Sequence, residues 1–122
     1  MIDGWLGPAP LVGIGGAAGA VARHLVYLRL DGERFPMATL AVNVFGSLAF
    51  GLLLFSDAGE SAMALAGIGF CGAFTTFSSF SVETVGLWER GERRTAALNA
   101  GVNLALSLSA IGLAWLVLAV GG

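Results

Sequence analysis

The sequence predicts an all-α integral membrane protein with a single domain, residues 1–122, built from four membrane-spanning helices. Of the 122 residues, 57% are hydrophobic and only 11% are charged, whereas soluble domains have roughly 25% charged residues. A bilayer core of about 30 Å requires about 20 apolar residues in a helix. Four stretches of the chain meet this length, approximately at residues 8–28, 36–56, 62–88 and 96–120.

Small residues mark the first stretch. Gly13, Gly15, Gly16 and Gly19 have the spacing that lets two helix backbones approach closely in a membrane. We expect this face to pack against another helix. The preceding segment MIDGWLGPAP has no basic region and no clear small-residue cleavage site, so we expect the first stretch to stay in the protein rather than act as a signal peptide.

Polar residues recur at steps of four in the second and fourth stretches, so each set lies on one helix face. The sets are Thr39, Asn43 and Ser47 in the second stretch, and Asn99, Asn103 and Ser107 in the fourth. Two interpretations are open: hydrogen bonds between packed helices, or a polar path across the membrane. Both sets contain amides and hydroxyls but no acid. Neutral donors favour an anion path, because cation paths typically have rings of carboxylates.

The third stretch contains the segment GFCGAFTTFSSFS, residues 69–81. Its glycines and threonines, Gly72 and Thr75 among them, predict a break near the middle of this helix, which a membrane tolerates only inside protein or beside a cavity. Phenylalanines recur at every third position: Phe74, Phe77 and Phe80. The edge of an aromatic ring is partly positive and can face a small anion, although the same spacing also suits helix packing.

The chain contains one cysteine, Cys71, and one histidine, His24, neither with a partner at any recognisable spacing. Nucleophilic and zinc chemistry are therefore not expected. We expect that the protein is not an enzyme, and we expect no nucleic-acid partner.

A longer pattern extends from Gly72 to Glu83 and reads GAFTTFSSFSVE. It resembles the third-helix signature of the Fluc (CrcB-type) fluoride channel family. The similarity continues in GGAAGAVAR with Arg23, in TLAVNVFGS with Thr39 and Asn43, in WERGE, and in the spacing of Ser107. It covers essentially the whole chain. Two residues depart from the family pattern: Asn103, where a tyrosine is common, and Ala73, where a glycine is common.

This resemblance implies a fluoride-selective channel in the cell membrane that exports fluoride from the cytoplasm by passive conduction and so lowers fluoride toxicity. The third helix would be broken near its middle, and the subunit would form an antiparallel (inverted) dimer. The ion path implied by the resemblance consists of Phe77, Phe80, Asn43, Thr39 and Ser107. Arg23 and Glu83 would lie at the pore entrance. The backbone carbonyls of Gly72 and Thr75 would hold a structural sodium ion that is not transported.

Charge is unequal on the two predicted sides of the membrane. All six basic residues fall on the side of the loops at residues 29–35 and 89–95: Arg23, Arg29, Arg34, Arg90, Arg93 and Arg94. The positive-inside rule places these loops in the cytoplasm. A chain that inserts in both directions should show little such bias. The inverted partner is therefore either an identical subunit or a separately encoded relative of opposite charge bias.

The alternative function is a small multidrug-type proton-coupled exporter, which has a similar length and four spans. Such an exporter needs an acid in the membrane, usually in the first helix, to exchange protons for a cation. The first stretch, residues 8–28, contains no acid, and Glu83 is the only acid within any predicted span.

Overall fold

The structure is a computed structural model that describes residues 7–30 and 34–121, and these residues contain only helices and their connections. Four helical segments are long and apolar enough to cross a membrane, which confirms the predicted class. They are α1 (Pro8–Arg29), α2 (Met37–Phe55), the composite segment Glu60–Glu89 and α6 (Arg93–Gly121). The largest difference from the predicted bounds is at α6, which begins at Arg93 rather than at residue 96. Apolar composition does not detect this first turn, because it is polar.

The third segment consists of four pieces. They are α3 (Glu60–Ala62), η2 (Met63–Cys71), α4 (Gly72–Phe74) and α5 (Ser78–Glu89). η2 is a π-helix of nine residues, a rare form that occurs frequently at functional sites. Between α4 and α5 the backbone of Thr75 is extended, with φ −80° and ψ 161°. The chain is therefore not helical over residues 75–77.

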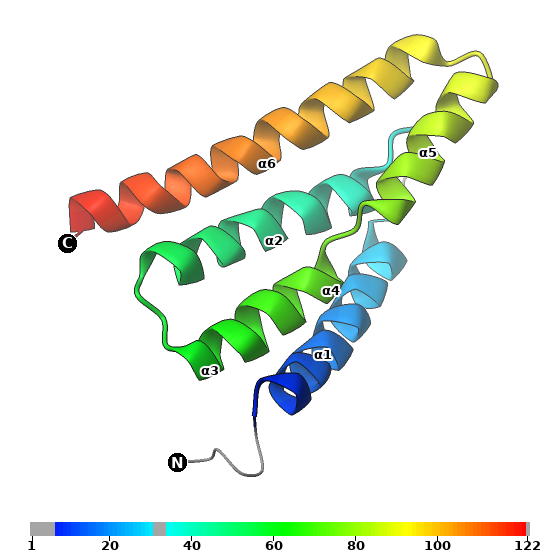
Figure 1. Ribbon diagram of the computed structural model, residues 1–122. Coiled ribbons are helices and arrows are strands. Elements are labelled where there is room, and N and C mark those ends of the chain that lie inside the picture. Colours follow the sequence, from blue (N-terminus) through cyan, green and yellow to red (C-terminus); the bar gives the residue numbers. More distant parts are fainter. Residues whose placement is uncertain (1–6, 31–33, 122) are drawn as a thin grey trace.

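The helices pack in the order α6, α2, η2 and α1, so that α2 is central (Figure 1). α4 continues η2 along α1, and α5 turns away to pack against α6. Figure 1 shows the start of α1, the end of α6 and the α2–α3 connection on the lower and left sides, and the α5–α6 connection at the upper right. An even number of crossings explains why α1 begins and α6 ends on the same side.

Glycines in α1 allow its close contact with η2. Gly15 and Gly19 are buried, and a Cβ atom on either would collide with a backbone carbonyl oxygen, that of Leu65 or Phe70. Gly13 has nothing within 4 Å of its Cβ position. The predicted packing role is thus confirmed for Gly15 and Gly19, whereas Gly13 faces open space.

A Schellman motif ends α5 and fixes the turn into α6. The Glu92 N–H donates to the Leu87 carbonyl (2.9 Å), and the Gly91 N–H donates to the Trp88 carbonyl (3.1 Å). Gly91 has φ +84°, a left-handed conformation that glycine adopts without strain. The turn holds Arg90 at the end of α5, where its side chain lies over Gly86.

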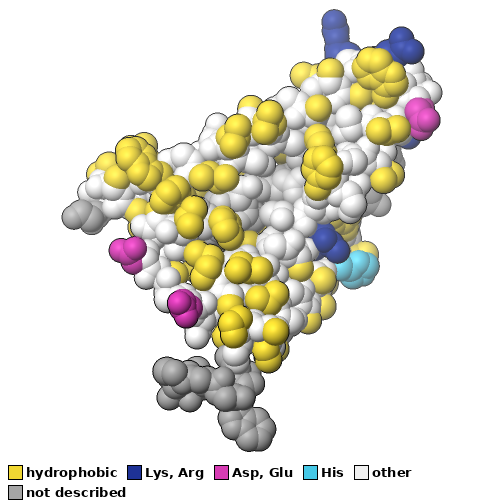
Figure 2. Space-filling view, viewed as in Figure 1, with side chains coloured by type: hydrophobic (Ala, Val, Ile, Leu, Met, Phe, Trp, Pro, Cys, Tyr) yellow, Lys and Arg dark blue, Asp and Glu magenta, His cyan; other side chains and the backbone are white. Residues whose placement is uncertain are grey.

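The surface carries many large apolar side chains, among them Val21, Phe45, Leu104 and Val120, which are 61–78% exposed. Figure 2 shows hydrophobic side chains over much of one face, with basic side chains concentrated at the end formed by the α5–α6 connection. Two acidic residues, Asp57 and Glu60, lie at the opposite end, beside the α2–α3 connection. An apolar band between charged ends is suited to lipid and to contact with another subunit.

Candidate ion pathway

The Asn43 side chain of α2 binds the backbone of the non-helical residues 75–77. Its Oδ1 accepts a hydrogen bond from the Thr76 N–H (2.8 Å), and its Nδ2 donates to the Thr76 carbonyl (3.1 Å). The amide thus pairs with Thr76 as another peptide group would, and satisfies two backbone groups that lost their helical partners. Asn43 stabilises this interruption of the helix.

A cavity of about 320 Å³ opens beside the interruption. We call it the phenylalanine cavity, and it is lined by Asn43, Ser47, Thr75, Thr76, Phe77, Phe80, Asn103, Leu104 and Ser107. This volume is well above the roughly 30 Å³ that one water molecule occupies in the liquid, so a small anion has room to enter. Four of the five side chains expected on the ion path line this one cavity: Asn43, Phe77, Phe80 and Ser107.

Phe77 ends the interruption and Phe80 lies in the first turn of α5, with ring centroids 5.8 Å apart and ring planes inclined by 43°. Phe77 is 79% exposed in the single chain. The cavity therefore has an open side formed by an aromatic ring that the described residues leave largely uncovered.

The fifth path residue, Thr39, does not line the phenylalanine cavity. It is completely buried, and its hydroxyl donates to Glu83 Oε1 (2.5 Å). Because that hydroxyl has one proton, the short contact between Tyr27 and Thr39 has the Tyr27 hydroxyl as donor. Sequence reasoning missed Tyr27, and the only available signal was that it is the single tyrosine, near the end of the first span.

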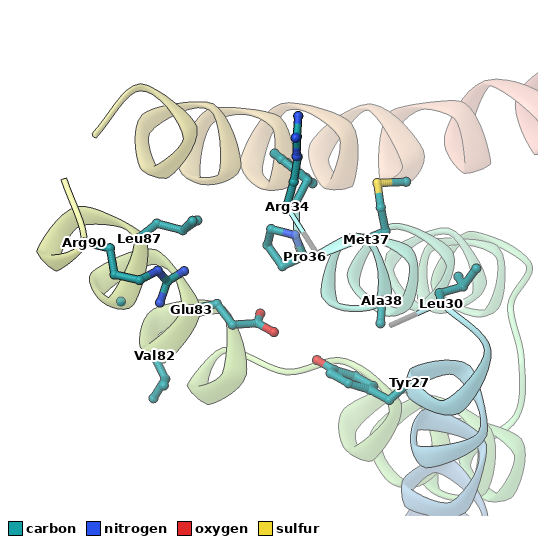
Figure 3. Close-up of a pocket in the computed structure, with 12 residues that line it drawn as sticks. Tyr27, Leu30, Arg34, Pro36, Met37, Ala38, Val82, Glu83, Leu87 and Arg90 are labelled. Carbon is teal, nitrogen blue, oxygen red and sulfur yellow. The ribbon is translucent and has the colours of Figure 1, made fainter. Parts of the chain in front are cut away.

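Glu83 and Tyr27 also line a second cavity of about 320 Å³, on the side of the α5–α6 connection. We call it the arginine cavity because Arg34 and Arg90 belong to its lining. Figure 3 shows the Glu83 carboxylate extending from α5 toward Tyr27, with the Arg90 guanidinium close to it. Glu83 follows Phe80 by one turn of α5, so the two cavities lie one turn apart, with the Tyr27, Thr39 and Glu83 side chains at the boundary.

Arg23 does not line the arginine cavity. Its Nη1 donates to the Ala73 carbonyl (2.8 Å), at the C-terminal end of α4. A guanidinium is favourable at this position because the last carbonyls of a helix are partly negative and lack helical partners. The structure thus places Arg23 at the helix interruption rather than with the arginines of the arginine cavity.

The carbonyls of Gly72 and Thr75 fit the cation expected from the resemblance. Thr76, whose N–H would continue the helix by binding the Gly72 carbonyl, donates to Asn43 instead, and no hydrogen bond between described residues reaches either carbonyl oxygen. Hard cations prefer oxygen ligands and take roughly six of them. Two carbonyls from one chain supply only part of such a set. No group of three His, Cys, Asp or Glu residues suited to a metal occurs within residues 7–30 and 34–121.

The polar residues predicted on α2 and α6 meet at the interface of these two helices. Some of them form hydrogen bonds between the helices, and some line a cavity, so both interpretations of the sequence apply. Asn43 Nδ2 donates to Asn103 Oδ1 (3.1 Å), and Asn103 in turn donates to Asn99. Asn43 and Asn103 thus join α2 to α6 and also line the phenylalanine cavity, as Ser47 and Ser107 do.

Fold and cavities together define a multi-pass membrane protein with a neutral, polar and aromatic cavity beside a helix interruption, features of an ion channel. The chain belongs to the family described as CrcB-like protein, Camphor Resistance (CrcB), whose family model matches residues 10–115. It is 58% identical over 107 residues to "Fluoride-specific ion channel FluC 2" of Haloarcula marismortui, covering 88% of this chain and 90% of that relative.

Other relatives have similar names. "Fluoride-specific ion channel FluC 1" of Halobacterium salinarum is 46% identical over 112 residues, covering 92% of this chain and 94% of the relative. "Fluoride-specific ion channel FluC 3" of Methanosarcina acetivorans is 39% identical over 109 residues, covering 88% and 98%. These names describe ion channels and not enzymes, in agreement with the sequence expectation.

Proposed function

We propose that this chain is the subunit of a fluoride-specific channel that lets fluoride leave the cytoplasm passively and so lowers its toxicity. The observation that carries this proposal is the phenylalanine cavity, in which Asn43 stabilises the interruption beside Phe77 and Phe80. Family membership and the names of the relatives support it.

The chemistry of the phenylalanine cavity suits a small anion. Its polar lining consists of amides and hydroxyls, with no carboxylate, and such donors can replace part of an anion's hydration shell. The edges of Phe77 and Phe80 would add partly positive hydrogens without a full charge. Fluoride would then bind weakly enough to leave again, as conduction requires.

The exporter alternative has no support in the comparisons. It would require an acid free to exchange protons with a cation near the bilayer centre. Glu83 is the only acid in a predicted span, and it accepts a hydrogen bond from the buried Thr39.

An antiparallel dimer would complete the site. Phe77 is 79% exposed, and Gly72 and Thr75 line an open groove of about 390 Å³ that also includes Gly46 and Cys71. An inverted second subunit placed on this groove would cover it and add its own two carbonyls. The combined carbonyls of Gly72 and Thr75 would then hold a sodium ion, which supplies positive charge to unpaired backbone oxygens at membrane depth and stabilises the assembly.

The arginines support a preferred orientation, with the loops at residues 29–35 and 89–95 in the cytoplasm. Residues 31–33 of the first loop lie outside the described residues. Such a bias favours an inverted partner that is a separately encoded relative. The numbering of the relatives as FluC 1, 2 and 3 indicates that related organisms encode several such chains. The identical partner is the other candidate.

Fluoride efflux from liposomes containing this chain alone tests the proposal, with a fluoride electrode, chloride as the control ion, and sodium or N-methylglucamine as the cation. Rapid fluoride flux with little chloride flux is expected, and loss of flux without sodium would support the sodium site. If flux requires a relative of opposite charge bias, the partner is that relative. Absence of flux with either partner would contradict the proposal.

Arg34 and Arg90 are expected to concentrate fluoride at the arginine cavity. Among the described residues, Arg90 makes one ion pair, a weak one in which Nε lies 3.9 Å from Glu92 Oε1, and both side chains are at least half exposed. Arg90→Gln should lower fluoride flux about threefold at about 10 mM ionic strength and very little at about 1 M, where the Debye length is about 3 Å. Arg94→Gln removes one charge from the same loop but not from the cavity. Equal effects of the two substitutions would show that only total loop charge matters.

A further inference from the structure

A continuous chain of hydrogen bonds runs from the helix interruption through α2 and α6 and back to α5. Asn43 Nδ2 donates to Asn103 Oδ1 (3.1 Å). Asn103 Nδ2 donates to Asn99 Oδ1 (2.8 Å), and Asn99 Nδ2 donates to Thr84 Oγ1 (2.9 Å). The Thr84 hydroxyl then donates to the Phe80 carbonyl (2.7 Å). The chain thus connects the backbone at Thr76, which binds Asn43, to the backbone at Phe80.

Backbone groups at both ends of this series of hydrogen bonds determine which group donates in each bond. The Thr76 N–H can only donate, so the Asn43 amide must turn its oxygen toward it. The Phe80 carbonyl can only accept, so the Thr84 hydroxyl gives its proton to Phe80 and accepts from Asn99. Reversing any one amide would bring two donors or two acceptors together.

The amides in the middle have little or no access to water outside the phenylalanine cavity, which Asn103 lines. Asn99 is completely buried and Asn103 is 5% exposed. Asn103 uses Nδ2 for both the carbonyl (3.0 Å) and Oδ1 of Asn99. Asn43 likewise uses Nδ2 for the Thr76 carbonyl and for Asn103. A group left unpaired in this network would be costly, because networks in a low-dielectric interior require every member to be satisfied.

We propose that Asn99 and Thr84 are positioning residues for the ion path, although neither lines the phenylalanine cavity. They orient Asn103 and, through it, the Asn43 amide. The same chain holds Thr76 and Phe80, which lie on opposite sides of Phe77, in a fixed relation to each other. This inference rests on the proposed fluoride function and assigns a role in selectivity to two residues outside the cavity.

The decisive variant is Thr84→Val, which keeps the shape of the side chain and removes the hydroxyl. The Asn99 amide then loses its acceptor, and the orientation of the three amides is set only from the Thr76 end. The fluoride-to-chloride flux ratio in liposomes should fall about tenfold, since an unsatisfied group in a buried network favours rearrangement. Thr84→Ser restores the hydroxyl and should restore the ratio.

Thr95→Val on α6 is the matched control, since the Thr95 side chain makes no hydrogen bond to the network. It should leave the ratio unchanged. Asn99→Ala breaks the same chain from α6 and should act like Thr84→Val, which keeps the test open if one variant does not fold. Melting temperatures in detergent identify variants that are merely unstable. A folded Thr84→Val or Asn99→Ala channel with the wild-type ratio would overturn the inference. Absence of flux from the wild-type chain, both alone and with a relative of opposite charge bias, would instead refute the proposed function itself.

Discussion

Replacing Asn43 by alanine is expected to reduce fluoride flux about a hundredfold. The substitution leaves the Thr76 N–H and carbonyl without their partner, at a cost of about 1–3 kcal/mol for each unpaired buried group. It also removes the amide that donates a hydrogen bond to Asn103 Oδ1. The residues between α4 and α5 can then adopt other conformations, and Phe77 and Phe80 lose their fixed positions beside the cavity. Fluoride efflux from liposomes measures the effect.

Ser56→Ala is the control for this substitution, because Ser56 lies at the end of the same helix and its hydroxyl donates a local hydrogen bond to the Leu53 carbonyl (3.2 Å). Its fluoride flux should match that of the unmodified chain. If Asn43→Ala conducts as rapidly as Ser56→Ala, then Asn43 neither lines nor stabilises the ion path. The main evidence that the phenylalanine cavity is the ion path would then be lost.

Gly15→Leu is expected to abolish the folded subunit. A Cβ atom at residue 15 would collide with the Leu65 carbonyl oxygen and come close to the Phe70 nitrogen. Backbone atoms of η2 cannot move aside as a flexible side chain could, so α1 and η2 must separate. Overpacking that shifts the backbone typically costs about 1–3 kcal/mol and occasionally more, and a collision with backbone atoms belongs at the upper end. Size-exclusion chromatography and thermal unfolding in detergent should show aggregation or a large loss of stability.

Gly13→Leu is the matched control, half a turn away on the same helix. Nothing lies within 4 Å of its Cβ position in the single chain, so the folded subunit should tolerate leucine there. Similar unfolding temperatures for the two variants would contradict the packing of α1 on η2. A Gly13→Leu subunit that folds but fails to dimerise would instead place Gly13 at the partner interface.

Composition and periodicity were enough to predict the class of this protein. An apolar stretch of about 20 residues has few alternatives to a membrane-spanning helix, because lipid cannot satisfy an unpaired backbone. The steps of four residues correctly grouped Asn43 with Ser47 and Asn103 with Ser107. Family resemblance identified the pattern from Gly72 to Glu83. These features depend on residues close together in the sequence, so they can be recognised without knowing the fold.

Tertiary structure decided which neighbour each face meets. Asn43 binds Thr76, 33 positions away, and Asn103, 60 positions away. Arg23 binds the Ala73 carbonyl, 50 positions away, and therefore does not join Arg34 and Arg90 at the arginine cavity. The periodicity of a sequence does not predict contacts between residues so far apart in the chain.

Contacts between distant residues also explain why two polar residues do not have the surroundings that their helix faces suggested. Thr39 shares a helix face with Asn43, yet it is buried against Tyr27 and Glu83 because α1 and α5 cover that turn of α2. Asn103 departs from the family pattern, and only its contacts reveal that it links Asn43 to Asn99. The sequence by itself determined the four spans, their polar faces and the family. Only the packing of the helices decided which polar groups line a cavity and which bind each other, because that choice depends on contacts between residues far apart in the chain.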